Sequence, residues 1–194
     1  MCSVDEMQAN AGGVFPRFRE RTRKRGRQMF VDFVASAVWG LLAAAHLSSV
    51  LKGRDYLDLG LFLFYALVAC FLVLRQPARR RGAWWENTLA WASAFLPMAG
   101  MRPVSGGWVV PGLVVQSVGM VGLITALLSL GRSFGIAPAD RGLVTTGLYR
   151  YVRHPLYATE LLFNFGYLLA NPSWRNLIVL AVALVTQVIR LLRE

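Results

Sequence analysis

The polar segment at residues 131–160 carries side chains able to do chemistry, and long apolar stretches flank it on both sides. Within it, Arg153 and His154 come directly before Pro155. Proline suits the first position of a helix, because its missing N–H costs no hydrogen bond there. We therefore expect a helix to begin at Pro155, with its free N–H groups beside Arg153 and His154. Such a position favours a carboxylate or a phosphate.

Other side chains of the segment add acid–base and aromatic chemistry. Glu160 falls about a turn and a half into the expected helix, and an acidic residue inside a membrane helix indicates a functional role. It is suited to hold an ammonium group or to accept a proton. Tyr149, Tyr151 and Tyr157 offer ring faces to a cation and hydroxyls to polar partners. Each side chain alone has a structural explanation, but their concentration in one segment favours a binding site.

The apolar stretches around this segment predict an all-α, polytopic membrane bundle. A helix needs roughly 20 apolar residues to cross the hydrocarbon core. Four stretches are good candidates and two more follow, of which the fifth is short and broken by Glu160 and Asn164. The expected spans are about 30–50, 57–74, 85–101, 109–130, 156–170 and 174–192. The turn signal Asn171-Pro172 allows the last two to form a helical hairpin. The prediction is five to six transmembrane helices.

We expect a single domain with three parts. A basic segment at 1–29 precedes four helices within 30–130, and the polar loop and the last two helices occupy 131–194. Apolar residues make up 56% of the chain and charged residues 16%, below the roughly 25% charged residues of soluble domains. This composition is typical of a protein whose solvent is partly lipid.

The distribution of basic residues predicts the orientation. Most of the 21 Lys and Arg residues lie near the N-terminus, after the second and fourth spans, and at the C-terminus. Cytoplasmic loops carry an excess of Lys and Arg, so six alternating crossings place both termini and the two Arg-rich loops in the cytoplasm. The Arg-, Ala-, Leu- and Val-rich composition favours a bacterial inner membrane. The net charge of +11 therefore reflects topology, and no aromatic-interleaved basic patch predicts nucleic-acid binding.

The remaining candidates for special chemistry are few. Cys2 and Cys70 show no metal-type spacing with histidine, so no metal is expected. Asp32 and Glu86 lie near the ends of expected spans, where we expect them to reach water. His46 lies deeper in its span, and we expect it to make a structural hydrogen bond. Nothing in these patterns fixes the oligomeric state.

Several short sequence motifs together resemble those of the superfamily of isoprenylcysteine carboxyl methyltransferases and phospholipid N-methyltransferases, which are integral membrane enzymes. The motifs are LGR at 130–132, LVTTG at 143–147, YRYVRHPLY at 149–157 and NP at 171–172. Arg190 and Glu194 match the start of the family's R-x-x-x-E-E element. The recognisable match covers about a third of the chain, and the R-H-P-x-Y core after G-x-Y is its most specific part.

The resemblance implies an S-adenosylmethionine site at the cytoplasmic face, with S-adenosylhomocysteine as product and a lipid or lipid-modified molecule as methyl acceptor. It assigns cofactor binding to the R-H-P-x-Y element and to the segment whose backbone lies along the cofactor. In this sequence these are Leu143, Val144, Tyr149, Arg153, His154, Pro155 and Tyr157. It places Arg190 and Glu194 near the cofactor and the acceptor, where Glu160 joins them as a catalytic candidate.

The nature of the acceptor decides whether a base is needed. A prenylcysteine-like carboxylate is already ionised, whereas a phospholipid amine must lose a proton, which calls for Glu160, Glu194 or His154. Alignment alone contributes about 7–11 kcal/mol to such a displacement. The sequence leaves both acceptors open.

The sequence departs from the family pattern in three places, and two other functions compete. Leu148 replaces the usual proline. Arg141, two residues upstream of Leu143, stands where many members carry His or Lys, and the second glutamate and tyrosine-containing tail do not follow Glu194. The missing tail favours a non-enzymatic protein of the same fold as one alternative. A nicotinamide-dependent membrane reductase is the other, since sterol reductases share a similar C-terminal architecture.

Overall fold

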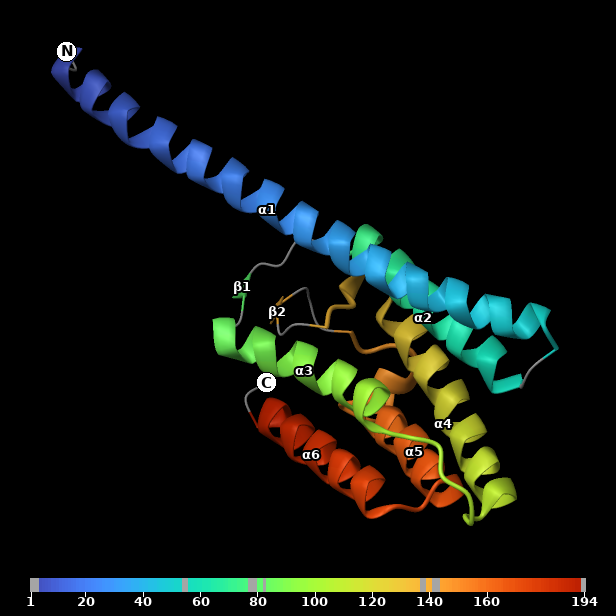
Figure 1. The fold of residues 1–194 in the computed structure, drawn as a ribbon. Coiled ribbons are helices and arrows are strands. Elements are labelled where there is room, and N and C mark those ends of the chain that lie inside the picture. The colour runs from blue at the N-terminus through green and yellow to red at the C-terminus, as the bar shows by residue number, and fades with distance from the viewer. Residues whose placement is uncertain are drawn as a thin grey trace.

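The described part of the chain is a bundle of six α-helices (Figure 1). The computed structural model describes residues 4–53, 56–76, 80–81, 83–136, 139–140 and 144–192. The helices are α1 (Val4–Leu51), α2 (Tyr56–Leu74), α3 (Trp84–Gly100), α4 (Val109–Leu130), α5 (Pro155–Ala170) and α6 (Trp174–Leu191). The connections hold the 3₁₀ helices η1 (Gly131–Ser133) and η2 (Gly147–Arg150) and the strands β1 (Arg80–Arg81) and β2 (Ala139–Asp140). The predicted all-α class is confirmed.

Four segments of these helices are long and apolar enough to cross a membrane. They are Met29–Leu51, Tyr56–Leu74, Val109–Ser133 and Trp174–Leu191. The other two helices, α3 and α5, have 17 and 16 residues and pack beside them. The chain is thus a polytopic helical bundle of membrane-protein character. The number of crossings, the orientation and the division at residues 29 and 130 stay predictions.

The connections gather at two opposite ends of the bundle (Figure 1). At one end, which we call the loop end, the α2–α3 and α4–α5 connections meet: the backbone N–H of Gln76 donates to the carbonyl of Arg132 at 2.9 Å, and β1 pairs with β2. The C-terminal end of α6 lies at this end too. The two Arg-rich loops therefore share one end of the bundle, as alternating spans require.

At the opposite end, which we call the turn end, Asn176 fastens α6 to the α3–α4 connection. Its side chain is completely buried; its Oδ1 accepts from the N–H of Arg102 at 3.0 Å, and its Nδ2 donates to the carbonyls of Arg102 and Asn171 at 2.8 Å each. The predicted turn at Asn171-Pro172 is confirmed, since α5 ends at Ala170 and α6 begins at Trp174. These bonds fix where α6 starts, and hence which residues it brings to the loop end.

Small residues let α4 and α5 approach each other closely. A Cβ atom added to Gly119 would lie 2.6 Å from the backbone nitrogen of Phe163, and one added to Gly166 would lie 2.6 Å from the backbone nitrogen of Gln116. Membrane helices associate through such contacts because lipid supplies no hydrophobic drive between them. The close α4–α5 contact determines where α5, the helix that follows the R-H-P element, lies in the bundle.

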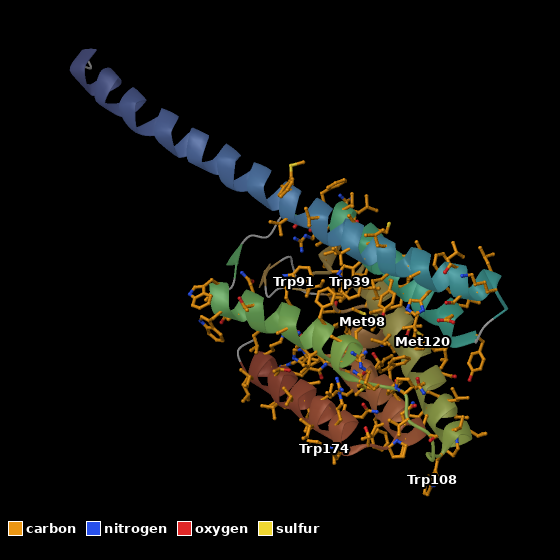
Figure 2. The ribbon with its side chains drawn as sticks, in the orientation of Figure 1. Trp39, Trp91, Met98, Trp108, Met120 and Trp174 are labelled. Carbon is orange, nitrogen blue, oxygen red and sulfur yellow. The ribbon has the colours of Figure 1, made fainter. Side chains whose placement is uncertain are left out.

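Aromatic side chains join α1, α2 and α3 near the middle of the bundle. Trp39 stacks on Phe95 with ring centroids 5.2 Å apart and tilts against Tyr65 at 5.3 Å. Trp91 stacks on Phe95 from the other side at 5.9 Å. Figure 2 shows Trp39 and Trp91 at this central position, and Trp108 and Trp174 at the turn end. Trp108 and Trp174 are exposed, as interfacial aromatics are.

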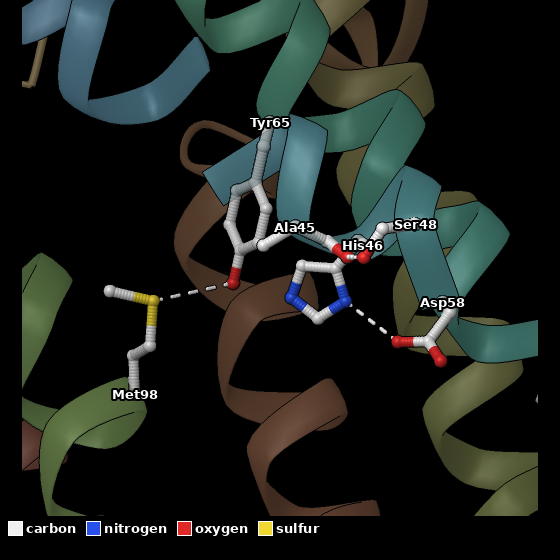
Figure 3. Close-up of polar contacts among 6 residues, drawn as sticks. All are labelled: Ala45, His46, Ser48, Asp58, Tyr65 and Met98. Carbon is white, nitrogen blue, oxygen red and sulfur yellow. Dashed lines mark hydrogen bonds and ion pairs between the residues drawn. The ribbon is translucent and has the colours of Figure 1, made fainter. Parts of the chain in front are cut away.

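Two acidic side chains near span ends form pairs inside the bundle. Asp32 binds the guanidinium of Arg75 through both of its oxygens and keeps a side-chain exposure of 15%, so an arginine next to α2 pairs with it and water still reaches it in part. His46 makes the expected hydrogen bond, since its Nδ1 lies 2.7 Å from Oδ1 of Asp58 (Figure 3). Glu86 accepts from the N–H of Ala83 at the start of α3, at 2.7 Å.

Candidate active site

The R-H-P element lies at the start of α5, at the loop end. The helix begins at Pro155, as predicted, and His154 is its N-cap residue. Pro155 is buried and His154 half-buried, whereas Arg153 is exposed. The first turn of α5 thus presents His154 inward, while Arg153 points away from the protein.

A short helix before this element is fitted closely against α4. Gly147 at the start of η2 has φ of +60°, a conformation that favours glycine. A Cβ atom there would clash with Oγ of Ser129 on α4. This approach holds Tyr149 of η2 half-buried beside the end of α4. Val144, also half-buried, lies three residues upstream of Gly147.

His154 and Tyr157 form a parallel ring pair on the first turn of α5. Their ring centroids are 5.7 Å apart and their planes differ by 2°. Residues three apart on a helix share a face, which explains why the two rings meet. The pair presents an aromatic surface toward α6, where it meets Arg190.

Arg190 connects four elements of the bundle. One of its terminal nitrogens donates to Oγ of Ser93 on α3 at 2.9 Å, and the other donates to the carbonyl of Ile136 at 3.0 Å and to the hydroxyl of Tyr157 at 2.9 Å. Its Cζ lies 4.8 Å from the centroid of the Tyr157 ring. The side chain is only 8% exposed. A buried guanidinium with these partners fixes α6 against α3, α5 and the α4–α5 loop.

Glu160 lies within reach of the Arg190 charge and is held by α6. Oε2 of Glu160 accepts a hydrogen bond from Nε2 of Gln187 at 2.9 Å, and the guanidinium of Arg190 attracts the carboxylate. Gln187 is 4% exposed. A carboxylate, an amide and a guanidinium therefore meet in one place beside the His154–Tyr157 pair.

The structure brings together half of the residues predicted for the site. His154, Pro155, Tyr157, Glu160 and Arg190 gather around the start of α5 and the end of α6. Val144 and Tyr149 lie along the α4–α5 loop, and Arg153 lies on its surface. Leu143 and Glu194 lie outside the described residues. No sets of His, Cys, Asp or Glu with metal-binding geometry occur among the described residues.

Sequence reasoning missed two members of the cluster, Ser93 and Gln187. The signal for Gln187 was present, because the buried stripe of α6 runs through Asn176, Val179, Ala183, Gln187 and Arg190 at helical spacing. Three polar residues on the buried stripe of an otherwise apolar helix indicate a functional face. Ser93 gave no such signal, since small hydroxyl residues are common at membrane helix contacts.

Comparison with known proteins agrees with this arrangement. Residues 104–194 match the family described as phospholipid methyltransferase. The matched segment contains α4, α5, α6 and the loop that carries the R-H-P element. No curated protein and no solved structure matches the chain.

Just under half of the chain is therefore similar to phospholipid methyltransferases, a family within the superfamily that also includes the isoprenylcysteine carboxyl methyltransferases.

Proposed function

We propose that this protein uses S-adenosylmethionine to methylate the amine of a membrane lipid at the loop end of the bundle. One observation carries the proposal: Arg190 joins the R-H-P-x-Y element, the α4–α5 loop and α3, about one helical turn from Gln187, which binds the carboxylate of Glu160. The positive-inside pattern supports the cytoplasmic face for this end and for both termini, and a bacterial inner membrane suits the composition.

The described residues fit an S-adenosylmethionine site. When bound, the cofactor supplies an electrophilic methyl group on a sulfonium and leaves as S-adenosylhomocysteine. Nε of Arg190 is buried and has no hydrogen-bond partner within the described chain, so it is able to donate to an anionic group. The ring faces of His154 and Tyr157 are suited to a cationic or heteroaromatic group. Val144, Tyr149, Arg153 and Pro155, with Leu143, complete the proposed cofactor-binding set.

Glu160 favours an amine over a carboxylate as methyl acceptor. An acceptor carboxylate brought beside the Glu160 carboxylate would be repelled, whereas an ammonium would be attracted and held. The ammonium gives one proton to Glu160, which leaves a lone pair on nitrogen for the new bond to carbon. The positive charge of Arg190 acts on this carboxylate and favours its ionised form, against the burial that disfavours it. Glu194 stays a candidate for the same step.

Calorimetry with S-adenosylmethionine and S-adenosylhomocysteine tests the cofactor part of the proposal. We expect the detergent-purified protein to bind both, and His154→Ala to weaken binding by about tenfold or more, because a ring contact and any hydrogen bond of the imidazole are lost. His46→Ala is the matched control, since the only other histidine pairs with Asp58 at a distance from the R-H-P element. Absence of binding by the unaltered, folded protein would contradict the proposal.

A further inference from the structure

Gln187 leaves one strong acceptor unused at the centre of the site. Its Nε2 donates to Glu160, but its Oε1 is buried and has no hydrogen-bond partner within the described chain. A buried carbonyl oxygen without a donor costs roughly 1–3 kcal/mol, so such an atom needs a reason. The amide cannot be reversed to remove the problem, because its oxygen would then face the carboxylate oxygen of Glu160.

The surroundings of this oxygen specify what donor would suit it. Arg190 already donates to Ser93, Ile136 and Tyr157, and its remaining Nε makes no hydrogen bond within the described chain. The Glu160 carboxylate is a second acceptor close by, because it is hydrogen-bonded to Nε2 of the same amide group. Two acceptors side by side, one of them anionic, suit a cation that carries more than one N–H.

We infer that Gln187 is a specificity residue for the methyl acceptor, with its Oε1 as the second acceptor for an ammonium headgroup whose first acceptor is Glu160. The inference rests on the proposed function and adds a rule to it. A primary ammonium has three N–H groups and engages both residues. A tertiary ammonium has one N–H and engages Glu160 alone, and a quaternary ammonium engages neither through hydrogen bonds.

The Gln187→Met variant tests this rule through the KM for the acceptor. Methionine keeps the length and apolar bulk but removes the carbonyl. We expect its KM to rise about tenfold more for a lipid with a primary ammonium headgroup than for one with a tertiary ammonium. Only the former loses a hydrogen bond to Oε1, whereas the lost bond from Nε2 to Glu160 affects both lipids alike. The assay uses methyl-labelled S-adenosylmethionine with lipids of primary, secondary and tertiary headgroups in mixed micelles.

A matched control and a measurement on the unaltered chain complete the test. Gln116→Met removes an equally buried glutamine from α4, away from the cluster, and should change the three KM values equally or not at all. In the unaltered protein we expect the KM for the acceptor to rise from primary to tertiary headgroups. This measurement does not depend on whether a variant folds. Two results would overturn the role of Gln187 but leave the proposed function standing. One is an equal KM change for all three lipids in Gln187→Met, and the other is the same KM for all three lipids in the unaltered protein. No transfer to any of them would overturn the proposed function as well.

Discussion

Replacing Arg190 with methionine is expected to lower kcat/KM for methyl transfer by about a hundredfold or more. The variant loses hydrogen bonds to Ser93, Ile136 and Tyr157 and the positive charge near Glu160. Each hydrogen bond from a charged group contributes roughly 1.5–3 kcal/mol, and two of them suffice for the expected loss. The measurement is transfer of labelled methyl groups to lipid by the purified protein.

Two further variants separate chemistry from general damage. Arg175→Met removes another arginine of α6, at the turn end, where its Nε donates to the carbonyl of Gly100 at 3.1 Å; it should leave kcat/KM within about twofold. Arg190→Lys keeps the charge but not the planar fork that serves three partners, so it should recover only part of the activity. Full activity in Arg190→Met would show that the hydrogen bonds converging on Arg190 do not contribute to methyl transfer.

The second large effect concerns packing: Gly119→Ala is expected to destabilise the protein by about 1–3 kcal/mol. The added methyl carbon would lie 2.6 and 2.8 Å from backbone atoms of Phe163, which cannot move aside as a flexible side chain can. Helices α4 and α5 must therefore separate, and the start of α5 moves with them. Thermal unfolding in detergent, followed by circular dichroism, measures the loss.

The same substitution at a different glycine provides the control. Gly40 lies within α1, and a Cβ atom there would meet nothing within 4 Å. Gly40→Ala should therefore raise stability by a few tenths to about 1 kcal/mol, through helix propensity alone. If both variants shift the unfolding temperature in the same direction, close backbone contact is not what holds α4 to α5.

The helices could be predicted from sequence because each carries its own signal. Apolar length defined the spans, and Pro155 and Asn171-Pro172 marked two helix boundaries that the structure confirms. The R-H-P-x-Y motif indicated that the candidate site is centred on the start of α5, because the motif combines a helix start with polar side chains in one short stretch. These features depend on neighbouring residues, which a sequence displays directly.

Contacts between distant segments could not be predicted in the same way. The pairing of Asp32 with Arg75 depends on how α1 packs on α2, and Ser93 reaches Arg190 across 97 positions of sequence. Gln187 is a middle case, since its helical spacing from Arg190 was visible but its partner on α5 was not. All three pairs depend on the register between helices, that is, on how far one helix is shifted along another. The Gly119 and Asn176 contacts help to set this register.

The most direct test of the central claim is the chemical nature of the transferred methyl group. The purified protein is incubated with methyl-labelled S-adenosylmethionine and a mixture of lipids bearing primary amines and lipid-linked carboxylates. The extracted lipid is then treated with base, which releases methanol from a methyl ester but leaves an N-methyl group in place. We predict base-stable label in the amine headgroup that falls sharply in Glu160→Gln. Volatile label released by base, or no transfer to lipid by the folded protein, would contradict the account.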